Sequence, residues 1–144
     1  MSDASWEFQR ALVTALKDAT PAIAQARIYD DLPDEVASAT APDEVFPYVH
    51  VGEMDSIPED VSASTGSGDD GEQETITLHV WSRYGGQKEI KQIMQQIKDL
   101  LHGQSLTVSG RASAHLYVRS RRSFLEQDGK TRHGVMSIEG IHRN

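Results

Sequence analysis

The period of the hydrophobic pattern changes once between residues 75 and 102, and this change restricts the fold more than any other feature of the sequence. Residues 75–82 alternate between apolar and polar side chains, which is typical of a strand with one buried face. Residues 87–102 instead place apolar side chains every three or four positions, which predicts an amphipathic helix that ends at Gly103. A strand and a helix of this kind bury their apolar sides against other elements.

Four further segments carry a clear pattern. Residues 2–20 have the spacing of another amphipathic helix, stopped by Pro21. Residues 46–53, 114–124 and 131–141 read as strands, and the Asp128-Gly129 pair between the last two is a strong hairpin signal. The weaker segments are residues 27–33, expected as a short edge strand or ordered loop, residues 34–44, expected as loop, and residues 106–108, expected to begin a strand.

Residues 55–74 are dominated by Ser, Gly, Asp and Glu. Such a segment buries too little apolar area to offset the entropy lost on ordering, so we expect a long mobile loop between two strands. The order of the elements predicts a single domain over residues 1–144, of the α+β class. Its sheet is expected to be mainly antiparallel, with the two main helices packed on one face.

Composition narrows the class of protein. Cysteine is absent, which excludes disulfides, thiol catalysis and thiolate metal sites and favours a reducing compartment. No apolar run approaches the roughly 20 residues of a membrane-spanning helix, and the N-terminus lacks the pattern of a signal peptide. We therefore expect neither membrane insertion nor export.

Charge is distributed unevenly along the chain. Residues 1–75 contain 17 Asp and Glu against 3 Lys and Arg, a net charge of −14. Residues 76–144 contain 5 acidic and 11 basic residues, a net charge of +6, so the whole chain carries −8. Such asymmetry commonly indicates charged partners or head-to-tail self-association.

Motifs for nucleotide or metal chemistry are incomplete. Gly129-Lys130-Thr131 resembles the tail of a phosphate-binding loop, but Phe124 occupies the position where that loop needs a glycine. The run Asp69-Asp70-Gly71-Glu72 lacks the ligand register of a calcium loop. No two histidines have the i, i+4 spacing that would place them on one helical face for zinc. We expect no cofactor and no metal.

An acid–base site is not indicated either. Asp30 and Asp31 are neighbours in an extended segment, where successive side chains point to opposite sides and do not face each other. No nucleophile elbow of the Gly-x-Ser-x-Gly type is present. A small hydrolase assembled from scattered His and Asp would need a site that only the folded chain creates, so an enzyme is not expected.

One basic cluster stands out, Arg119-Ser120-Arg121-Arg122. On a regular strand, Arg119 and Arg121 would share a face with Tyr117, a combination that can contact a phosphate backbone. The overall acidity opposes long-range attraction to nucleic acid. We favour a solvated strand face or a protein interface and keep a DNA-contacting accessory protein as the alternative.

With these segments placed, the sequence resembles the tail completion, or tail terminator, proteins of long-tailed bacteriophages and gene transfer agents. Five stretches carry the resemblance, in this order along nearly the whole chain: Arg27-Ile-Tyr-Asp-Asp-Leu-Pro33, Phe46-Pro-Tyr-Val-His-Val-Gly-Glu53, Leu78-His-Val-Trp-Ser-Arg83 followed by Gly85-Gly86, Leu101-His-Gly103, and Asp128-Gly-Lys-Thr-Arg-His-Gly-Val135.

The resemblance implies a structural virion protein that forms a ring, a hexamer in the family, on the head-proximal end of the tail tube. Such a ring ends polymerisation of the major tail tube protein and offers the surface for head–tail joining to the connector or stopper protein. DNA would pass through its lumen without sequence-specific binding. A head-side connector or stopper ring is the nearest alternative.

A ring uses heterologous contacts, in which one patch of a subunit meets a different patch of the next. We therefore expect acidic segments before Thr75 to meet basic segments after it. The candidate contact residues are Arg83, Arg119, Arg121, Arg122 and Arg132 on the basic side and Asp30, Asp31, Asp69, Asp70 and Glu72 on the acidic side.

Overall fold

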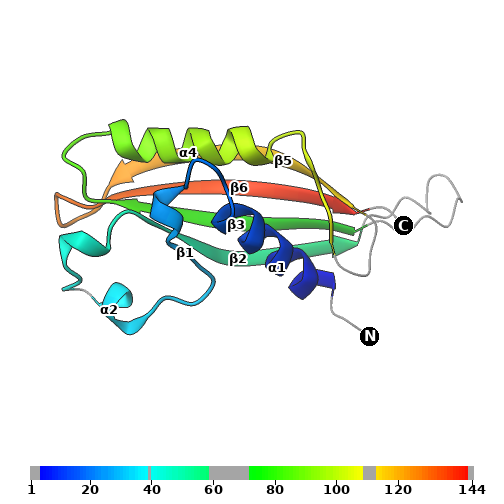
Figure 1. Ribbon diagram of the computed structural model, residues 1–144, viewed down its shortest axis with the longest axis horizontal. Coiled ribbons are helices and arrows are strands. Elements are labelled where there is room, and N and C mark those ends of the chain that lie inside the picture. Colours follow the sequence, from blue (N-terminus) through cyan, green and yellow to red (C-terminus); the bar gives the residue numbers. More distant parts are fainter. Residues whose placement is uncertain (1–3, 39, 59–71, 109–112, 143–144) are drawn as a thin grey trace, which may run out of the picture.

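A six-stranded sheet forms the centre of the fold (Figure 1). The computed structural model describes residues 4–38, 40–58, 72–108 and 113–142. Its elements, in chain order, are α1 (Ala4–Lys17), the 3₁₀ turn η1 (Ala24–Ala26), β1 (Ile28–Tyr29), α2 (Asp34–Ala37), the 3₁₀ turn η2 (Asp43–Val45), β2 (Tyr48–Pro58), β3 (Glu72–Ser82), α4 (Lys88–Leu101), β4 (Ser105–Leu106), β5 (Ala114–Leu125) and β6 (Arg132–His142).

The strands lie in the order β1-β2-β3-β6-β5-β4. The short β1 runs parallel to β2, and every other neighbouring pair is antiparallel. The four long strands β2, β3, β6 and β5 therefore alternate in direction across the sheet. The expected α+β class with a mainly antiparallel sheet is confirmed.

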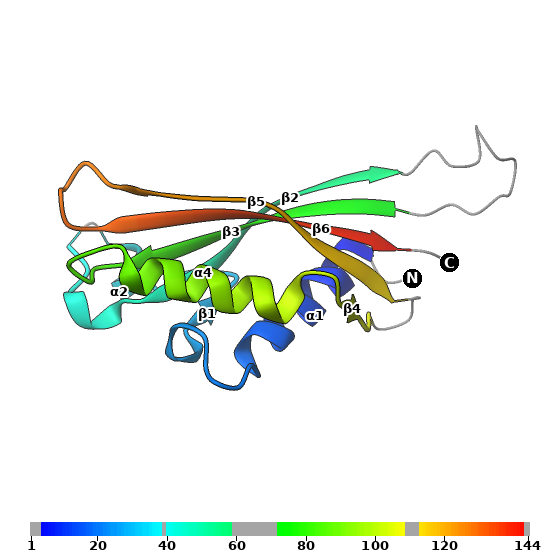
Figure 2. The same cartoon turned by 90° about the horizontal axis from the view of Figure 1, so that it is seen from above.

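Both long helices pack on the same face of the sheet, as Figure 2 shows. Two glycines of β6 mark their places, because each leaves no room for a Cβ atom. A Cβ at Gly140 would lie 2.6 Å from Phe8 of α1, and one at Gly134 would lie 2.9 Å from Met94 of α4. The glycines thus allow the helices to approach the sheet closely.

The core lies between this face and the two helices. The alternation predicted for β3 is confirmed, since its inward side chains are fully buried: Ile76, Leu78 and Val80. They pack in one cluster with the apolar stripes of α1 and α4, represented by Phe8, Leu12, Leu16, Ile90 and Ile97. Gly103 follows α4 with φ of 75°, as expected for a residue that ends a helix.

A pair of polar side chains is buried at one end of this core. Glu74 and His142 are 0% and 1% exposed, and the Oε2 atom of Glu74 lies 2.9 Å from Nε2 of His142. Ser5 of α1 donates a hydrogen bond of 3.2 Å to the other carboxylate oxygen. The polar contact ties the start of α1 to β3 and β6.

Two expectations for the loops are wrong. Residues 34–44, expected as loop, contain α2 and most of η2. The expected loop 55–74 is shorter, because β2 continues to Pro58 and β3 begins at Glu72, with Pro58 paired to Glu72. Both strands gain ladder hydrogen bonds that outweigh the polar composition of these residues. The remainder of the expected loop, residues 59–71, lies outside the described residues.

None of the described helices is long and apolar enough to cross a membrane.

Candidate interface on the uncovered face of the sheet

The other face of the sheet, called the uncovered face below, carries the residues of β3 that alternate with the core: Thr75, Thr77, His79 and Trp81. In the part of the chain that the structure describes, no helix packs on this face (Figure 2). These four side chains are half-buried. Antiparallel partners share a face, so Val135, Ser137 and Glu139 of β6 belong to it as well.

The basic cluster of β5 is divided by a bulge. Val118 lies opposite Ile138, but Ser120 lies opposite Ser137, so Arg119 is an extra residue in the strand. Beyond the bulge the faces are exchanged. The prediction that Arg119 and Arg121 share a face with Tyr117 is therefore wrong, because Arg121 lies opposite Met136 on the helix-covered side.

Arg119 has an ion-pair partner within the chain. Its guanidinium donates two hydrogen bonds to one carboxylate oxygen of Glu139, through Nε at 2.9 Å and through Nη2, and lies 4.8 Å above the ring of Tyr117. Gln73 donates to the second oxygen of Glu139. The charge of Arg119 is thus matched at the centre of the uncovered face.

Arg121 and Arg122 are exposed like Arg119, but their contacts differ. Arg121 donates a 3.0 Å hydrogen bond to the side-chain oxygen of Gln95 on α4, and both arginines line a groove of about 370 Å³ between α4 and β5. Arg122 lies opposite Val135 and places its guanidinium 5.5 Å from the ring centre of Phe124. Neither arginine has a carboxylate partner among the described residues.

Arg83 holds two loops together inside the subunit. It donates to the hydroxyl of Thr131, to the carbonyl of Ala41 and to the carboxylate of Asp43, each at 2.9 Å. Its side chain is 11% exposed and stacks on Phe46 at 4.5 Å. These contacts leave Arg83 little surface to offer a neighbouring subunit.

The other predicted contact residues are dispersed. Arg132 begins β6 opposite Leu125 and is half-buried. Asp30 and Asp31 are exposed just after β1. Glu72 is the first residue of β3, and Asp69 and Asp70 lie outside the described residues. Of the acidic candidates within the described ranges, Asp30 and Asp31 thus follow β1, whereas Glu72 pairs with Pro58 at the end of β2.

A chain of four polar side chains crosses the uncovered face, and no local sequence pattern predicts it. Glu53 lies 3.1 Å from Nε2 of His79, Nδ1 of His79 lies 2.8 Å from Nε2 of His133, and Nδ1 of His133 lies 2.8 Å from Glu126. Gly52 makes room for it, since a Cβ there would lie 2.8 Å from the His79 ring. Only the register of β2, β3 and β6 brings these residues together.

The three hydrogen bonds of this chain require three ring protons, whereas two neutral imidazoles carry two. A fully bonded network thus contains one imidazolium. Burial opposes that charge and lowers the pKa of His133, although the hydrogen bond with Glu126 acts in the other direction. At the acidic end, the hydrogen bond from His79 lowers the pKa of Glu53. His133 therefore takes up the additional proton less readily than an ordinary histidine.

Aromatic side chains surround the same site. Trp81 stacks on His133 with ring centres 3.7 Å apart, and its buried indole N–H has no hydrogen-bond partner among the residues that the structure describes. At the end of the sheet, Phe124 and Leu125 are 39% and 46% exposed. Apolar exposure beside exposed arginines is typical of a protein contact surface.

The hairpin that resembles a phosphate loop binds its own carboxylate. The backbone N–H groups of Lys130 and Thr131 and the hydroxyl of Thr131 all donate to Asp128, at 2.9, 2.8 and 2.5 Å. These bonds, led by the one from the Thr131 hydroxyl, lower the pKa of Asp128 to about 2. The turn interpretation is confirmed, because the donors a phosphate would need are already used.

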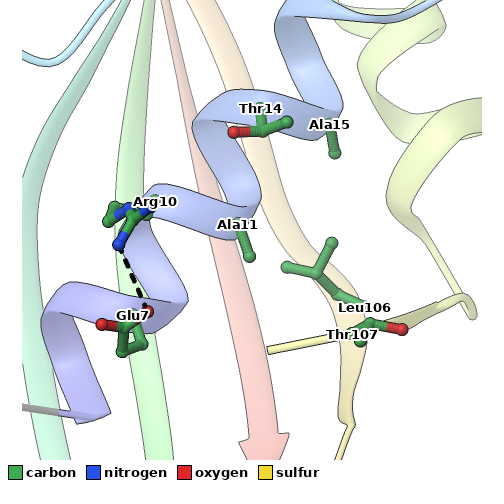
Figure 3. Close-up of a pocket in the computed structure, with 7 residues that line it drawn as sticks. All are labelled: Glu7, Arg10, Ala11, Thr14, Ala15, Leu106 and Thr107. Atoms are coloured by element: carbon green, nitrogen blue, oxygen red, sulfur yellow. Dashed lines mark ion pairs between the residues drawn. The ribbon is translucent and has the colours of Figure 1, made fainter. Parts of the chain in front are cut away.

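A metal centre has no counterpart in the described ranges, where no three His, Asp or Glu residues lie close enough to hold an ion. A groove of about 370 Å³ also runs between α1 and the end of β4 (Figure 3). Its lining includes Glu7 and Arg10, 3.7 Å apart, and the apolar Leu106.

Known proteins resemble this chain in sequence and in structure. A family model described as tail completion protein gp17 matches residues 10–143. A chain from the virion of a native gene transfer agent particle is similar in structure, with a TM-score of 0.77, 16% sequence identity and complete coverage of both chains. The bacteriophage SPP1 gp17 protein is similar with a TM-score of 0.51 and 22% identity over 100% of this chain and 98% of that one. Among curated proteins there is no match.

Proposed function

The chain belongs to the tail completion protein gp17 family, and from this membership we propose that it forms a ring, a hexamer, on the head-proximal end of a phage-type tail tube. The predicted family is thereby confirmed, and the protein is a structural component of a virion rather than an enzyme. In the proposed role the ring ends polymerisation of the tail tube protein and presents the surface to which the connector or stopper of the filled head binds.

The observation that carries this proposal is the family match over nearly the whole chain, residues 10–143. The surface described above supports it. A sheet face without a helix, exposed arginines on β5 and exposed Phe124 and Leu125 suit contacts with other protein subunits.

DNA would pass through the lumen of such a ring without specific contacts. The chain carries a net charge of −8, and Arg119 is already paired with Glu139. An acidic ring holds a phosphate backbone weakly and allows it to slide. Steeply salt-sensitive retention of DNA by the isolated protein would instead support the DNA-contacting alternative.

Imaging tests the proposal directly. Purified protein is added to preassembled tubes of the cognate tail tube protein, and the mixture is examined by negative-stain electron microscopy. We expect a ring at one end of each tube and no further elongation when free tube protein is added. Rings bound to isolated heads but not to tubes would support the stopper alternative, and bare tube ends that keep growing would contradict the proposal.

A further inference from the structure

Among the described residues, one edge of the sheet is open along most of its length. The short β4 pairs only with Ala114 and His115 of β5. The next backbone groups on the outer side of β5 also have hydrogen-bond partners. Leu116 exchanges hydrogen bonds with Gly103 and Gln104, and the N–H of Val118 donates to the ring of His102 at 2.9 Å. From Arg119 to Leu125, no described segment forms backbone hydrogen bonds with the outer side of β5.

The opposite edge is open as well. The short β1 pairs only with Val49 and His50 of β2. From Gly52 to Pro58, the outer side of β2 has no strand beside it within the described part of the chain. Each edge thus presents a row of unpaired N–H and C=O groups, the feature that recruits another strand.

The two open edges carry opposite charge. Between Ala114 and Leu125 the charged residues are Arg119, Arg121 and Arg122, and the segment contains no acid. Between Tyr48 and Pro58 the charged residues are Glu53 and Asp55, and the segment contains no Lys or Arg. Glu53 is 74% exposed despite its contact with His79.

The directions of the strands also fit. Because β2, β3, β6 and β5 alternate in direction, β2 and β5 run opposite ways. A second copy related by rotation about an axis roughly along the strands keeps those directions, so its β2 would lie antiparallel to β5 of the first copy. The pairing needs no change of fold.

The rows of the sheet bring the charges to similar heights. One row runs Asp55–Thr75–Glu139–Tyr117 from edge to edge. In the next copy of an unstaggered ring, Asp55 would lie level with Tyr117, two residues from Arg119. A stagger of a few residues, as in closed sheets, moves Asp55 toward Arg121 and Arg122.

We propose that copies of this chain join edge to edge, the acidic open edge of β2 against the basic open edge of β5, so that one antiparallel sheet continues from subunit to subunit. This inference rests on the proposed ring. It also specifies the contact between subunits: the sequence predicted only that acidic segments before Thr75 meet basic segments after it. The helices then lie on one side of a continuous sheet, and the uncovered face lies on the other.

Cysteine cross-linking tests the contact, because the chain has no cysteine of its own. Asp55→Cys is combined in one chain with Ser120→Cys or with Arg122→Cys, all on the uncovered face. Within a subunit these sites are three strand spacings apart, about 14 Å, which is beyond the reach of a disulfide. Any disulfide therefore joins two chains. The matched control combines Asp55→Cys with Lys88→Cys, because Lys88 is an exposed residue of α4 on the other side of the sheet.

We expect oxidation at tube ends to give a covalent ladder that stops at the ring size for at least one β2–β5 pair and not for the control. Rings that image normally but give no ladder with either pair would overturn the edge contact and leave the proposed function standing. The absence of both rings and ladders would overturn both.

A backbone variant provides an independent test. The N–H of Glu126 donates inward to Thr131, so by alternation the N–H of Ser123 points outward. Ser123→Pro removes that donor at an edge, where proline is tolerated. We expect a folded monomer with an unchanged circular dichroism spectrum and at least tenfold weaker ring formation. Ring formation equal to that of the unmodified chain would contradict edge pairing.

Discussion

At the scale of single residues, two glycines of β6 show how contact geometry determines the effect of a substitution. Both lie under a helix, and a Cβ at either would approach a side chain closer than 3.0 Å. At Gly140 the neighbour is the ring of Phe8, which is fully buried and rigid. At Gly134 the nearest neighbour is the thioether of Met94, the flexible end of an adaptable side chain.

Gly140→Ala should therefore destabilise the fold more than Gly134→Ala. Overpacking of a rigid core site costs about 1–3 kcal/mol, and we expect the first variant to fall in that range and the second near its lower limit. Urea denaturation followed by tryptophan fluorescence measures both. Equal losses would show that Phe8 moves as easily as Met94.

At the scale of elements, hydrophobic period predicts the regular structure and local irregularities escape it. The helices and the strand at residues 75–82 were identifiable because each has one buried side. The β5 bulge was not, since one inserted residue leaves no mark in composition and exchanges the faces of Arg121 and Arg122. The turn η1 is equally hidden: Ala24, Gln25 and Ala26 have φ of 51°, 56° and 62°, a region where these residue types are uncommon.

The candidate site also has a part that the sequence predicts and a part that it does not. The sequence identified the basic residues of β5 but not their partners, because Gln95 and Glu139 come from distant elements. The network of Glu53, His79, His133 and Glu126 exists only through the register of three strands and the adjoining turn. A local sequence pattern does not predict contacts between residues so far apart in the chain.

This network should make stability depend on pH. Because the pKa of His133 lies below its ordinary value of 6.5 in the folded chain, the unfolded chain binds the proton more readily. We expect the free energy of unfolding to fall as the pH decreases from 6.5 to about 5 and to be level above 7. Denaturant titrations across this range measure the slope.

His133→Gln should flatten that slope, because glutamine does not titrate. His115→Gln provides the control, since His115 is exposed and contacts Ser105 at the far end of the sheet. A slope that survives in His133→Gln would assign the pH dependence to another group.

At the scale of the whole molecule, the division of charge by sequence becomes a division between the two edges of one sheet. Glu53 and Asp55 lie toward one edge, and Arg121 and Arg122 toward the other. Screening of such exposed charges is strong at high ionic strength, because the Debye length is about 10 Å at 0.1 M salt and about 3 Å at 1 M.

Self-association should therefore weaken with salt. We expect rings or oligomers to dissociate at several-fold higher protein concentration in 0.5 M than in 0.05 M sodium chloride, as measured by sedimentation velocity. Arg122→Glu should reduce association at low salt, whereas Lys88→Glu, which makes the same change of charge on α4, should leave it unaltered. Association that strengthens with salt would indicate an apolar contact instead.

The alternation of the long strands has a further consequence, one of parity. The sheet has four long strands between its open edges, an even number, so its two edges are antiparallel and the same unit can repeat without reversal. An insertion that added one long antiparallel strand at an edge would make the number odd and place two parallel edges side by side. A relative that joins through the same edges is thus free to lengthen its strands or vary its turns, but it must gain or lose long strands in pairs.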